Sequence, residues 1–354
     1  MSHSKTKILF LYSELAEYTI ACFHELLNYD TEIHVVRWPV NPEAPFQFEI
    51  SSGIHLYERN ELDRSKLINL VKKIQPHIIV SSGWMDKDYV KTCRYFFGKI
   101  PTILTLDNHW TGSMKQKTAV LLAPFTILKT FSHAWVPGNI QKQYALKLGF
   151  PEHAIKTGFY SANTALYNRF YEDSFPDKQK KFPKVILYVG RYVAHKGIFE
   201  MWDAFRQIQE TNPNEWELWC AGTGDEFPNK TEHPKIKHFG FVQPKQMGKL
   251  IAESGIYILP SRFEPWGVSV HEFAVAGFPL LLSKQVGAAE KFLQTGKNGF
   301  EFESGNVASV KNAMQKVFAL DEQQLLKMGK QSHEIGMTHS PKIWAETLLS
   351  FLDN

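Results

Sequence analysis

The chain has 354 residues, a hydrophobic content of 44%, a charged content of 21% and a formal net charge of +4. This length exceeds the usual size of one core and predicts two domains. The composition is that of an ordinary globular protein, and the small charge excess is too weak to predict a nucleic-acid partner. Three cysteines without metal or redox spacing, Cys22, Cys93 and Cys220, predict buried free thiols.

The N-terminus runs from a short basic start directly into a strand-like segment. It lacks the long apolar region and the cleavage site of a signal peptide. No stretch approaches the roughly 20 apolar residues of a membrane-spanning helix. These features predict a cytoplasmic protein.

Short apolar runs alternate with helical patterns along the whole chain. In the first half, strands are predicted at 7–13, 31–38, 77–83, 102–108 and 134–138, and helices at 16–27, 64–74 and 88–97. A charged stretch with two prolines, at 169–183, predicts a linker. Further strands are predicted at 184–190, 216–222, 235–241, 256–261 and 279–284. This alternation indicates two α/β domains, each doubly wound around a parallel sheet.

The segment 259–279 is the most informative one. Glu264 follows a predicted strand, a Pro-Trp-Gly turn comes next, and Glu272 lies inside the helix that follows. A helix start presents backbone N–H groups that attract phosphate. A carboxylate accepts hydrogen bonds from paired sugar hydroxyls. The segment therefore predicts a site for a nucleotide sugar, against the alternative of a loop Glu and a helix-surface Glu paired with lysines.

Two cations, Arg191 and Lys196, follow the first strand of the second half and are framed by Gly190 and Gly197. Ligands of such sheets bind beyond the carboxyl ends of the strands. Two cations there suit a diphosphate whose charge grows as a leaving group departs. The alternative is a surface Arg and a surface Lys in a solvated loop.

Taken together, these motifs closely resemble the retaining glycosyltransferases of family 4 (glycosyl transferases group 1), which have the GT-B fold. Glu264 and Glu272 match the E-x7-E spacing, and 189–197 resembles the G-R-x4-K-G motif. The segment 216–226 is similar to the family's strand followed by G-x-G, and 238–254 to its base-binding turn and helix. The similarity extends in order to about residue 303, whereas the first half matches only in outline.

The resemblance implies a particular architecture. Two Rossmann-like doubly wound domains would face each other across a cleft. The acceptor-binding domain would span 1–168, the linker 169–183 and the nucleotide-sugar-binding domain 184–336. A helix within 337–354 would cross back and pack on the first domain.

The resemblance also implies roles for single residues. The donor diphosphate would be bound by Arg191, Lys196 and the helix start at Gly267 and Val268. Glu264, near the anomeric carbon, would act in catalysis and contact the donor sugar together with Pro265 and Trp266, although a packing role for Trp266 is an equal alternative. Ribose and base would be held by Glu272, Gly222, Thr223, Gly224, Phe241 and Val242.

The first domain departs from the family pattern. Many relatives carry a Gly-Gly pair after the first strand, where this chain has Ser13 and Glu14, so these two become candidates for contacting the acceptor. Asp107 ends a later strand where relatives often have histidine, and His109 follows it. Either residue is a candidate to orient the acceptor or take up its proton. The alternative is an Asp that caps a turn and a His bound to local backbone.

An apolar stretch at 118–128 is flanked by Lys115, Lys117 and Lys129. One interpretation is a buried helix with lysines at its ends. The other is a contact of 115–129 with anionic lipid, which would make the protein peripheral at the inner membrane face.

The resulting prediction is a retaining, metal-independent hexosyltransferase. It would move a sugar from a nucleotide-diphosphate donor to a saccharide or lipid-linked acceptor in cell-surface glycan synthesis, without a cofactor. A nucleotide-sugar epimerase on the same scaffold and a degenerate, non-catalytic relative that binds a sugar nucleotide are the alternatives. The donor sugar, its base, the acceptor and the oligomeric state stay open.

Overall fold

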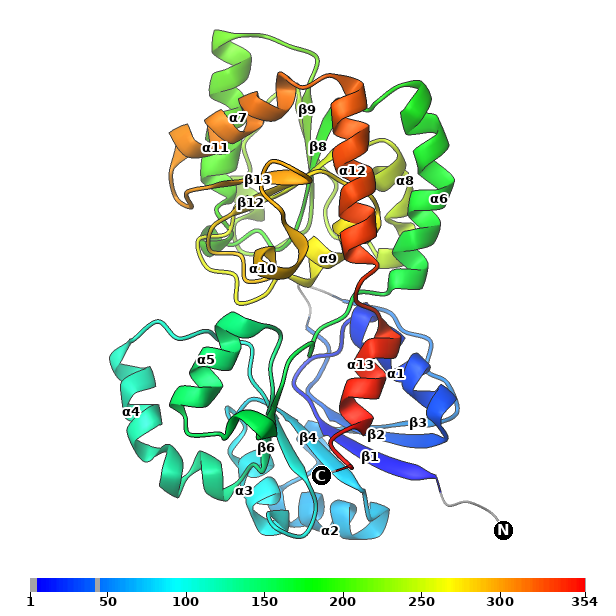
Figure 1. Ribbon diagram of the computed structural model, residues 1–354, viewed down its shortest axis with the longest axis vertical. Coiled ribbons are helices and arrows are strands. Elements are labelled where there is room, and N and C mark those ends of the chain that lie inside the picture. Colours follow the sequence, from blue (N-terminus) through cyan, green and yellow to red (C-terminus); the bar gives the residue numbers. More distant parts are fainter. Residues whose placement is uncertain (1–4, 42–44, 354) are drawn as a thin grey trace. The chain divides into compact units, whose positions relative to one another are not determined.

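The computed structural model describes residues 5–41 and 45–353, which form two compact units (Figure 1). The first unit contains the described residues up to 41, residues 45–161 and the chain from 339 onward. The second unit contains residues 162–338. Each unit is built around one parallel β-sheet.

The sheet of the first unit has the strand order β3-β2-β1-β4-β5-β6-β7. Its strands are β1 (Thr6–Leu11), β2 (Thr31–Arg37), β3 (Ile54–Glu58), β4 (Ile78–Ser82), β5 (Thr102–Thr105), β6 (His133–Trp135) and β7 (Ile155–Lys156). Its α-helices are α1 (Glu17–Leu26), α2 (Arg64–Ile74), α3 (Lys87–Phe96), α4 (Met114–Leu122), α5 (Asn139–Lys147) and α13 (Pro341–Leu349).

The central strand β1 shows why this sheet is covered on both faces. Successive side chains of a strand point to opposite faces. Ile8 and Phe10 belong to one buried cluster, and Leu9 and Leu11 belong to another. A strand buried on both faces is apolar throughout, as parallel strands between helical layers are.

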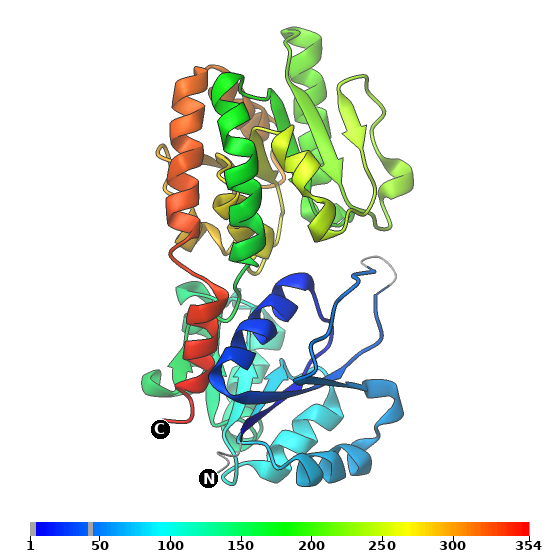
Figure 2. The same ribbon diagram turned by 90° about the vertical axis from the view of Figure 1, so that its right-hand side faces the viewer.

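The C-terminal helix α13 packs on the first unit beside α1, as the sequence predicted (Figure 2). Trp344 anchors it: the indole is 2% exposed, and its Nε1–H donates to the Phe159 carbonyl at 2.6 Å. Its ring lies 4.9 Å from that of Trp135, centroid to centroid. The last turns of the chain therefore complete the core of the domain in which the chain begins.

The sheet of the second unit has the order β10-β9-β8-β11-β12-β13. Its strands are β8 (Val185–Val189), β9 (Glu217–Ala221), β10 (Ile236–His238), β11 (Ile256–Leu259), β12 (Leu280–Ser283) and β13 (Gly299–Phe302). Its α-helices are α6 (Thr164–Lys180), α7 (Ile198–Thr211), α8 (Gly248–Ala252), α9 (Val268–Val275), α10 (Ala289–Phe292), α11 (Val307–Phe318) and α12 (Glu322–Gly336).

Both sheets reverse their strand order beside their first strand. The reversal lies between β1 and β4 in the first unit and between β8 and β11 in the second. In doubly wound sheets, ligands bind beyond the carboxyl ends of the two strands at this reversal. Each unit therefore has one place where a binding site is expected.

The ten strands that the sequence predicts are confirmed, each to within a few residues, whereas β3, β7 and β13 were not predicted. The predicted linker at 169–183 is wrong, because α6 continues to Lys180 with Pro176 inside it. This helix packs on α8, α9 and α12, and the rings of Tyr171 and His333 stack at 3.8 Å. The charges on its outer face made a packed helix resemble a solvated linker.

The stretch at 115–129 is not a buried helix, so that interpretation is wrong. No residue of α4 is buried, and Ala123 and Ile127 are the buried residues of the following 3-10 turns. Ala119, Val120 and Leu128 are partly buried against the core. Among the described residues, no helix combines the length and apolarity needed to cross a membrane. Cys22, Cys93 and Cys220 are buried free thiols, as predicted.

Lys178 of α6 is a buried lysine with a stability consequence. Burial lowers its pKa to about 7, and its ammonium lies 4.0 Å from the centroid of the Phe278 ring. An unfolded lysine titrates near 10.4. Between these values the unfolded state binds more protons, so stability rises with pH, and below about pH 7 the folded state carries the full cost of a buried charge.

We therefore expect Lys178→Met to stabilise the protein by roughly 2 kcal/mol or more near pH 6.5, and by progressively less toward pH 10. Urea unfolding at several pH values measures this change. Lys180→Met, an exposed position on the same helix, is the matched control and should have little effect. A gain that is equal at both ends of the pH range would contradict the assignment.

Candidate functional site

An ion pair lies at the strand-order reversal of the second unit. Glu264, in the loop after β11, contacts Lys196, which ends the short turn after β8. Ser261 Oγ donates to the same carboxylate oxygen, Oε2, at 3.1 Å. The side chains of Lys196 and Glu264 are only 16% and 11% exposed. Because little water screens the pair, the two charges interact strongly and stay oriented.

Close backbone contact between the two loops positions this pair. Gly197 has φ +69°, and a Cβ there would lie 2.1 Å from the Pro260 carbonyl oxygen. Arg262 N–H donates to the His195 carbonyl at 2.8 Å. Only glycine combines this left-handed conformation with so close an approach. The lysine and the glutamate are thus held by loops that meet at contact distance.

Arg191 and His195 lie in the same loop after β8. Arg191 is exposed, and its carbonyl accepts a hydrogen bond from Tyr188 OH at 2.8 Å. Burial lowers the pKa of His195, the charges of Lys196 and Arg191 lower it further, and Glu264 opposes them. His195 is therefore neutral at pH 7. The charges that act on it include both members of the ion pair, Lys196 and Glu264. His195 was not among the residues predicted for the site, although it lies within the Arg191–Lys196 motif.

The helix α9 begins next to Glu264. Its N-cap, Gly267, has φ +91° and provides no capping side chain, so the first turn presents its N–H groups and the positive end of its dipole. A Cβ on Gly267 would lie 3.0 Å from Glu264 Cγ, which places the helix start beside the carboxylate. Val268 opens the helix, and Glu272 lies half-buried one turn further on.

The loop after β9 contacts the loops after β8 and β10. A Cβ on Gly222 would lie 1.9 Å from the Gly190 carbonyl oxygen, and Gly222 N–H donates to the Gly240 carbonyl at 2.7 Å. Tyr192 N–H donates to the Thr223 carbonyl at 2.8 Å. The structure thus joins the loops after β8, β9 and β10, which carry the half-exposed residues Gly222, Thr223, Gly224, Phe241 and Val242.

Trp266 has a different environment from the one proposed for a sugar contact. It is 3% exposed and packs against Phe292. Its indole Nε1–H has no hydrogen-bond partner among the described residues. This environment supports a packing role for Trp266. Its neighbour Pro265 is half-buried.

In the first unit, a pocket of about 390 Å³ lies at the strand-order reversal. Ser13, Glu14 and Asp107, which the sequence singled out, all line it. Tyr160 OH donates to Asp107 Oδ2 at 3.3 Å, and burial, assisted by the Asp107 charge, raises the pKa of Tyr160 well above its usual value. This phenol therefore stays protonated and can donate to the carboxylate at any physiological pH.

His109 differs from Asp107 in its place. It is not among the described residues that line the pocket. Its carbonyl accepts a hydrogen bond from Gln116 Nε2 at 2.7 Å, and burial lowers the pKa of its imidazole. Of the two candidates, Asp107 is the one that a ligand in this pocket would meet.

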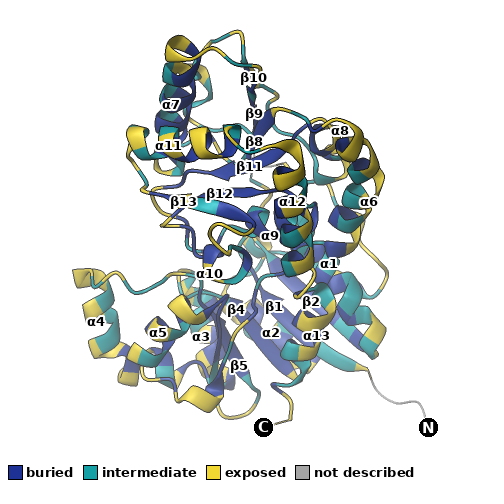
Figure 3. Cartoon of the chain, turned by 45° about the horizontal axis from the view of Figure 1, so that its top comes forward, coloured by how far each residue is buried: buried dark blue, intermediate teal, exposed yellow. Residues whose placement is uncertain are grey.

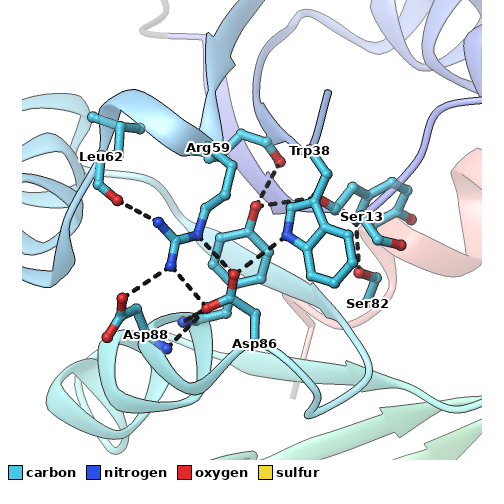
Figure 4. Close-up of polar contacts among 10 residues, drawn as sticks. Ser13, Trp38, Arg59, Leu62, Ser82, Asp86 and Asp88 are labelled. Atoms are coloured by element: carbon cyan, nitrogen blue, oxygen red, sulfur yellow. Dashed lines mark hydrogen bonds and ion pairs between the residues drawn. The ribbon is translucent and has the colours of Figure 1, made fainter. Parts of the chain in front are cut away.

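A half-buried ion-pair network lies at the end of the loop after β4, next to the pocket-lining residues Trp84 and Met85 (Figure 4). Arg59 pairs with Asp86 at 2.7 Å and with Asp88 at 2.9 Å, and Trp38 Nε1–H donates to Asp86 at 3.3 Å. Burial opposes ionisation of Asp86, but Arg59 and the first N–H groups of α3 outweigh it and lower the pKa. The network fixes the loop after β4. The Ser13 N–H donates a hydrogen bond to Ser82 Oγ at 3.0 Å, which links the loop after β1 to the end of β4.

One group of side chains among the described residues could hold a metal ion. Glu32, His34 and His55, on β2 and β3, have ligand atoms within 4.8 Å of one another. The group includes none of the residues predicted for the site.

Comparison with known proteins supports a family assignment for the second unit. Residues 171–334 match the family model described as Glycosyl transferases group 1. A glycogen synthase of Mycobacterium tuberculosis is 29% identical over 142 residues, which cover 38% of this chain and 34% of that protein. The match thus spans about a third of the length of such curated relatives. The family model thus matches most of the second unit and less than half of the chain.

Solved structures extend the comparison to both units. Sucrose-phosphate synthase from Thermosynechococcus elongatus superposes with a TM-score of 0.73 at 16% identity, covering 98% of each chain. Anabaena HepE in complex with UDP and glucose gives a TM-score of 0.73 at 14% identity, covering 99% of this chain and 100% of that one. The fold is GT-B, with two Rossmann-like domains.

The contact at Gly197 allows a test of how the ion pair is positioned. We expect Gly197→Ala to destabilise the protein by about 2 kcal/mol or more, because alanine is strained at this φ and its Cβ meets the Pro260 carbonyl. Gly296→Ala is the matched control, since Gly296 has φ +80° but a Cβ placed there would meet no atom within 4 Å. Equal losses of stability, measured by urea unfolding, would show that loop contact is not the constraint.

Proposed function

We propose that this protein is a glycosyltransferase that moves a hexose-type sugar from a nucleotide-diphosphate donor to a saccharide or lipid-linked acceptor, with retention of configuration. The single observation that carries the proposal is the Lys196–Glu264 pair beside the start of α9. It combines a cation, a carboxylate and a helix start without a capping side chain, at the strand-order reversal where doubly wound sheets bind ligands.

The proposed donor uses each of these groups. Lys196 and Arg191 neutralise the diphosphate, while the N–H groups at Gly267 and Val268 bind its oxygens. Once Lys196 turns toward phosphate, Glu264 accepts hydrogen bonds from hydroxyls of the donor sugar, and Glu272 accepts those of the ribose. The loops carrying Gly222 to Gly224 and Phe241 to Val242 hold the base. Anabaena HepE, which shares the fold, has been crystallised with UDP-glucose, and this supports a nucleotide-sugar donor.

The proposed acceptor binds in the pocket of the first unit. Glu14 and Asp107 receive its hydroxyl groups, and Ser13 adds a small polar contact. In the reaction, the acceptor oxygen forms a bond to the anomeric carbon as the bond from that carbon to the phosphate oxygen breaks. The acceptor's proton passes to the departing phosphate on the same face. Such a step requires neither a protein nucleophile nor a metal, and no cofactor.

The proposed setting is the cytoplasm, with a role in cell-surface glycan synthesis. A lipid-linked acceptor would require the protein to work at the inner face of a membrane. A saccharide acceptor would impose no such requirement.

The donor proposal predicts a specific set of losses. Thermal-shift and donor-hydrolysis assays against UDP-, GDP-, ADP- and CMP-sugars should give a stabilising hit that names the base, because a ligand bound only by the folded state stabilises it. Lys196→Ala, Arg191→Ala and Glu264→Ala should each lower turnover at least about 100-fold. Lys284→Ala, which breaks an exposed ion pair with Glu303, is the control and should leave turnover unchanged.

The outcomes separate the alternatives. A folded wild type that no nucleotide sugar stabilises would contradict the donor site. Binding without turnover would indicate a degenerate sugar-nucleotide-binding relative, and conversion of the sugar without an acceptor would indicate an epimerase.

The acceptor proposal predicts that Asp107, not His109, matters for transfer. We expect Asp107→Asn to lower acceptor-dependent transfer about 10- to 100-fold while slow donor hydrolysis persists, because the carboxylate contacts the acceptor and not the donor. His109→Ala should reduce transfer less than Asp107→Asn does. A larger loss of transfer in His109→Ala than in Asp107→Asn would indicate that the functional residue lies outside the pocket.

A further inference from the structure

Much of the helix α4 is coloured as exposed in Figure 3. Large apolar residues of this helix and of the turn that follows it are among the exposed ones. Met114, Leu121 and Phe125 are 74%, 74% and 72% exposed, and Leu122 is 48% exposed. Met114 and Leu121 are seven residues apart on α4, a spacing that places them on one face of the helix, and Phe125 ends the 3-10 turn that follows. Clustered apolar side chains of this size on a surface mark an interaction site more often than single ones do.

The segment that carries this apolar stripe has charges of one sign. Between Asp107 and Glu152 the sequence contains no Asp or Glu, and it contains five lysines. Lys115, Lys117 and Lys129 are exposed or half-exposed on the same helix and its following turns. Arg94 of α3 donates to the Phe125 carbonyl at 3.5 Å, so a further cation lies beside the stripe. Glu152 is the nearest acid after it in sequence and is already paired with Lys142 at 2.7 Å.

We propose that the stripe formed by Met114, Leu121, Leu122 and Phe125, together with Lys115, Lys117 and Lys129, docks the protein on an anionic lipid bilayer. An interfacial helix buries apolar side chains at the level of the headgroups while its cations meet anionic lipid. The exposed stripe and the exposed lysines of its segment supply these two contributions. The helix lies on the bilayer and does not cross it.

A second copy of the chain is a less suitable occupant. A symmetric dimer brings the same patch of each subunit together. Lys115, Lys117 and Lys129 would then lie near their own counterparts, and no acid of the segment 108–151 could compensate them. An anionic bilayer offers these lysines the opposite charge.

The proposal is independent of the donor chemistry, since vesicle binding is measured without substrate. In co-sedimentation, we expect the wild type to bind vesicles of equal parts phosphatidylglycerol and phosphatidylcholine, and to bind phosphatidylcholine vesicles at least about tenfold more weakly. The double variant L121E/F125E should lose at least about tenfold in binding. Replacing Lys115, Lys117 and Lys129 by Gln should lose about fivefold per lysine and remove most of the salt dependence.

Two controls keep the result interpretable. Met337→Glu places a carboxylate at an exposed apolar position of the second unit and should bind vesicles as the wild type does. Circular dichroism and thermal unfolding confirm that each variant is folded, and the Lys→Gln variant gives an answer even where L121E/F125E is unstable. A wild type that fails to bind anionic vesicles at low salt would overturn the proposal. So would concentration-dependent self-association that L121E/F125E abolishes while vesicle binding is unchanged.

Discussion

The chemistry proposed for the second unit depends on one constraint: the loops after β8 and β11 must meet at backbone contact distance. Gly197 permits this meeting, because any side chain there would collide with the Pro260 carbonyl. The contact places Lys196 against Glu264 in a site with little water. Each member of the pair keeps the other in a fixed orientation. In our proposal, Lys196 exchanges the Glu264 carboxylate for an arriving diphosphate without a large rearrangement.

The two sheets share one strand order and differ in what they place at its reversal. In the second unit, the loops at this reversal carry Lys196, Arg191 and a helix start, all of which favour negative charge. In the first unit, aromatic rings and hydroxyl groups line the pocket together with Glu14 and Asp107. The same topology therefore gives two positions of opposite electrostatic character, and the difference arises from loop sequence alone.

The sequence predicted features that depend on local pattern and missed those that depend on packing. Apolar runs revealed ten strands, and the spacing of Glu264 and Glu272 was enough to single out the proposed donor region. The charges of α6 concealed a packed helix, because which side of a helix is buried depends on its neighbours. The apolar stretch of α4 could not be assigned to core or surface for the same reason. His195 was missed because its neighbours Lys196 and Glu264 come together only in the fold.

The first-unit pocket has charged residues at the place where this chain departs from the family pattern. Where the family resemblance leads one to expect a Gly-Gly pair, this chain has Ser13 and Glu14. Among the described residues that line the pocket there is no Lys, Arg or His, whereas two carboxylates are present. Carboxylates repel phosphate and accept hydrogen bonds from hydroxyl or ammonium groups. The two carboxylates therefore make this pocket unfavourable for phosphate, which agrees with our proposal that the diphosphate binds in the second unit.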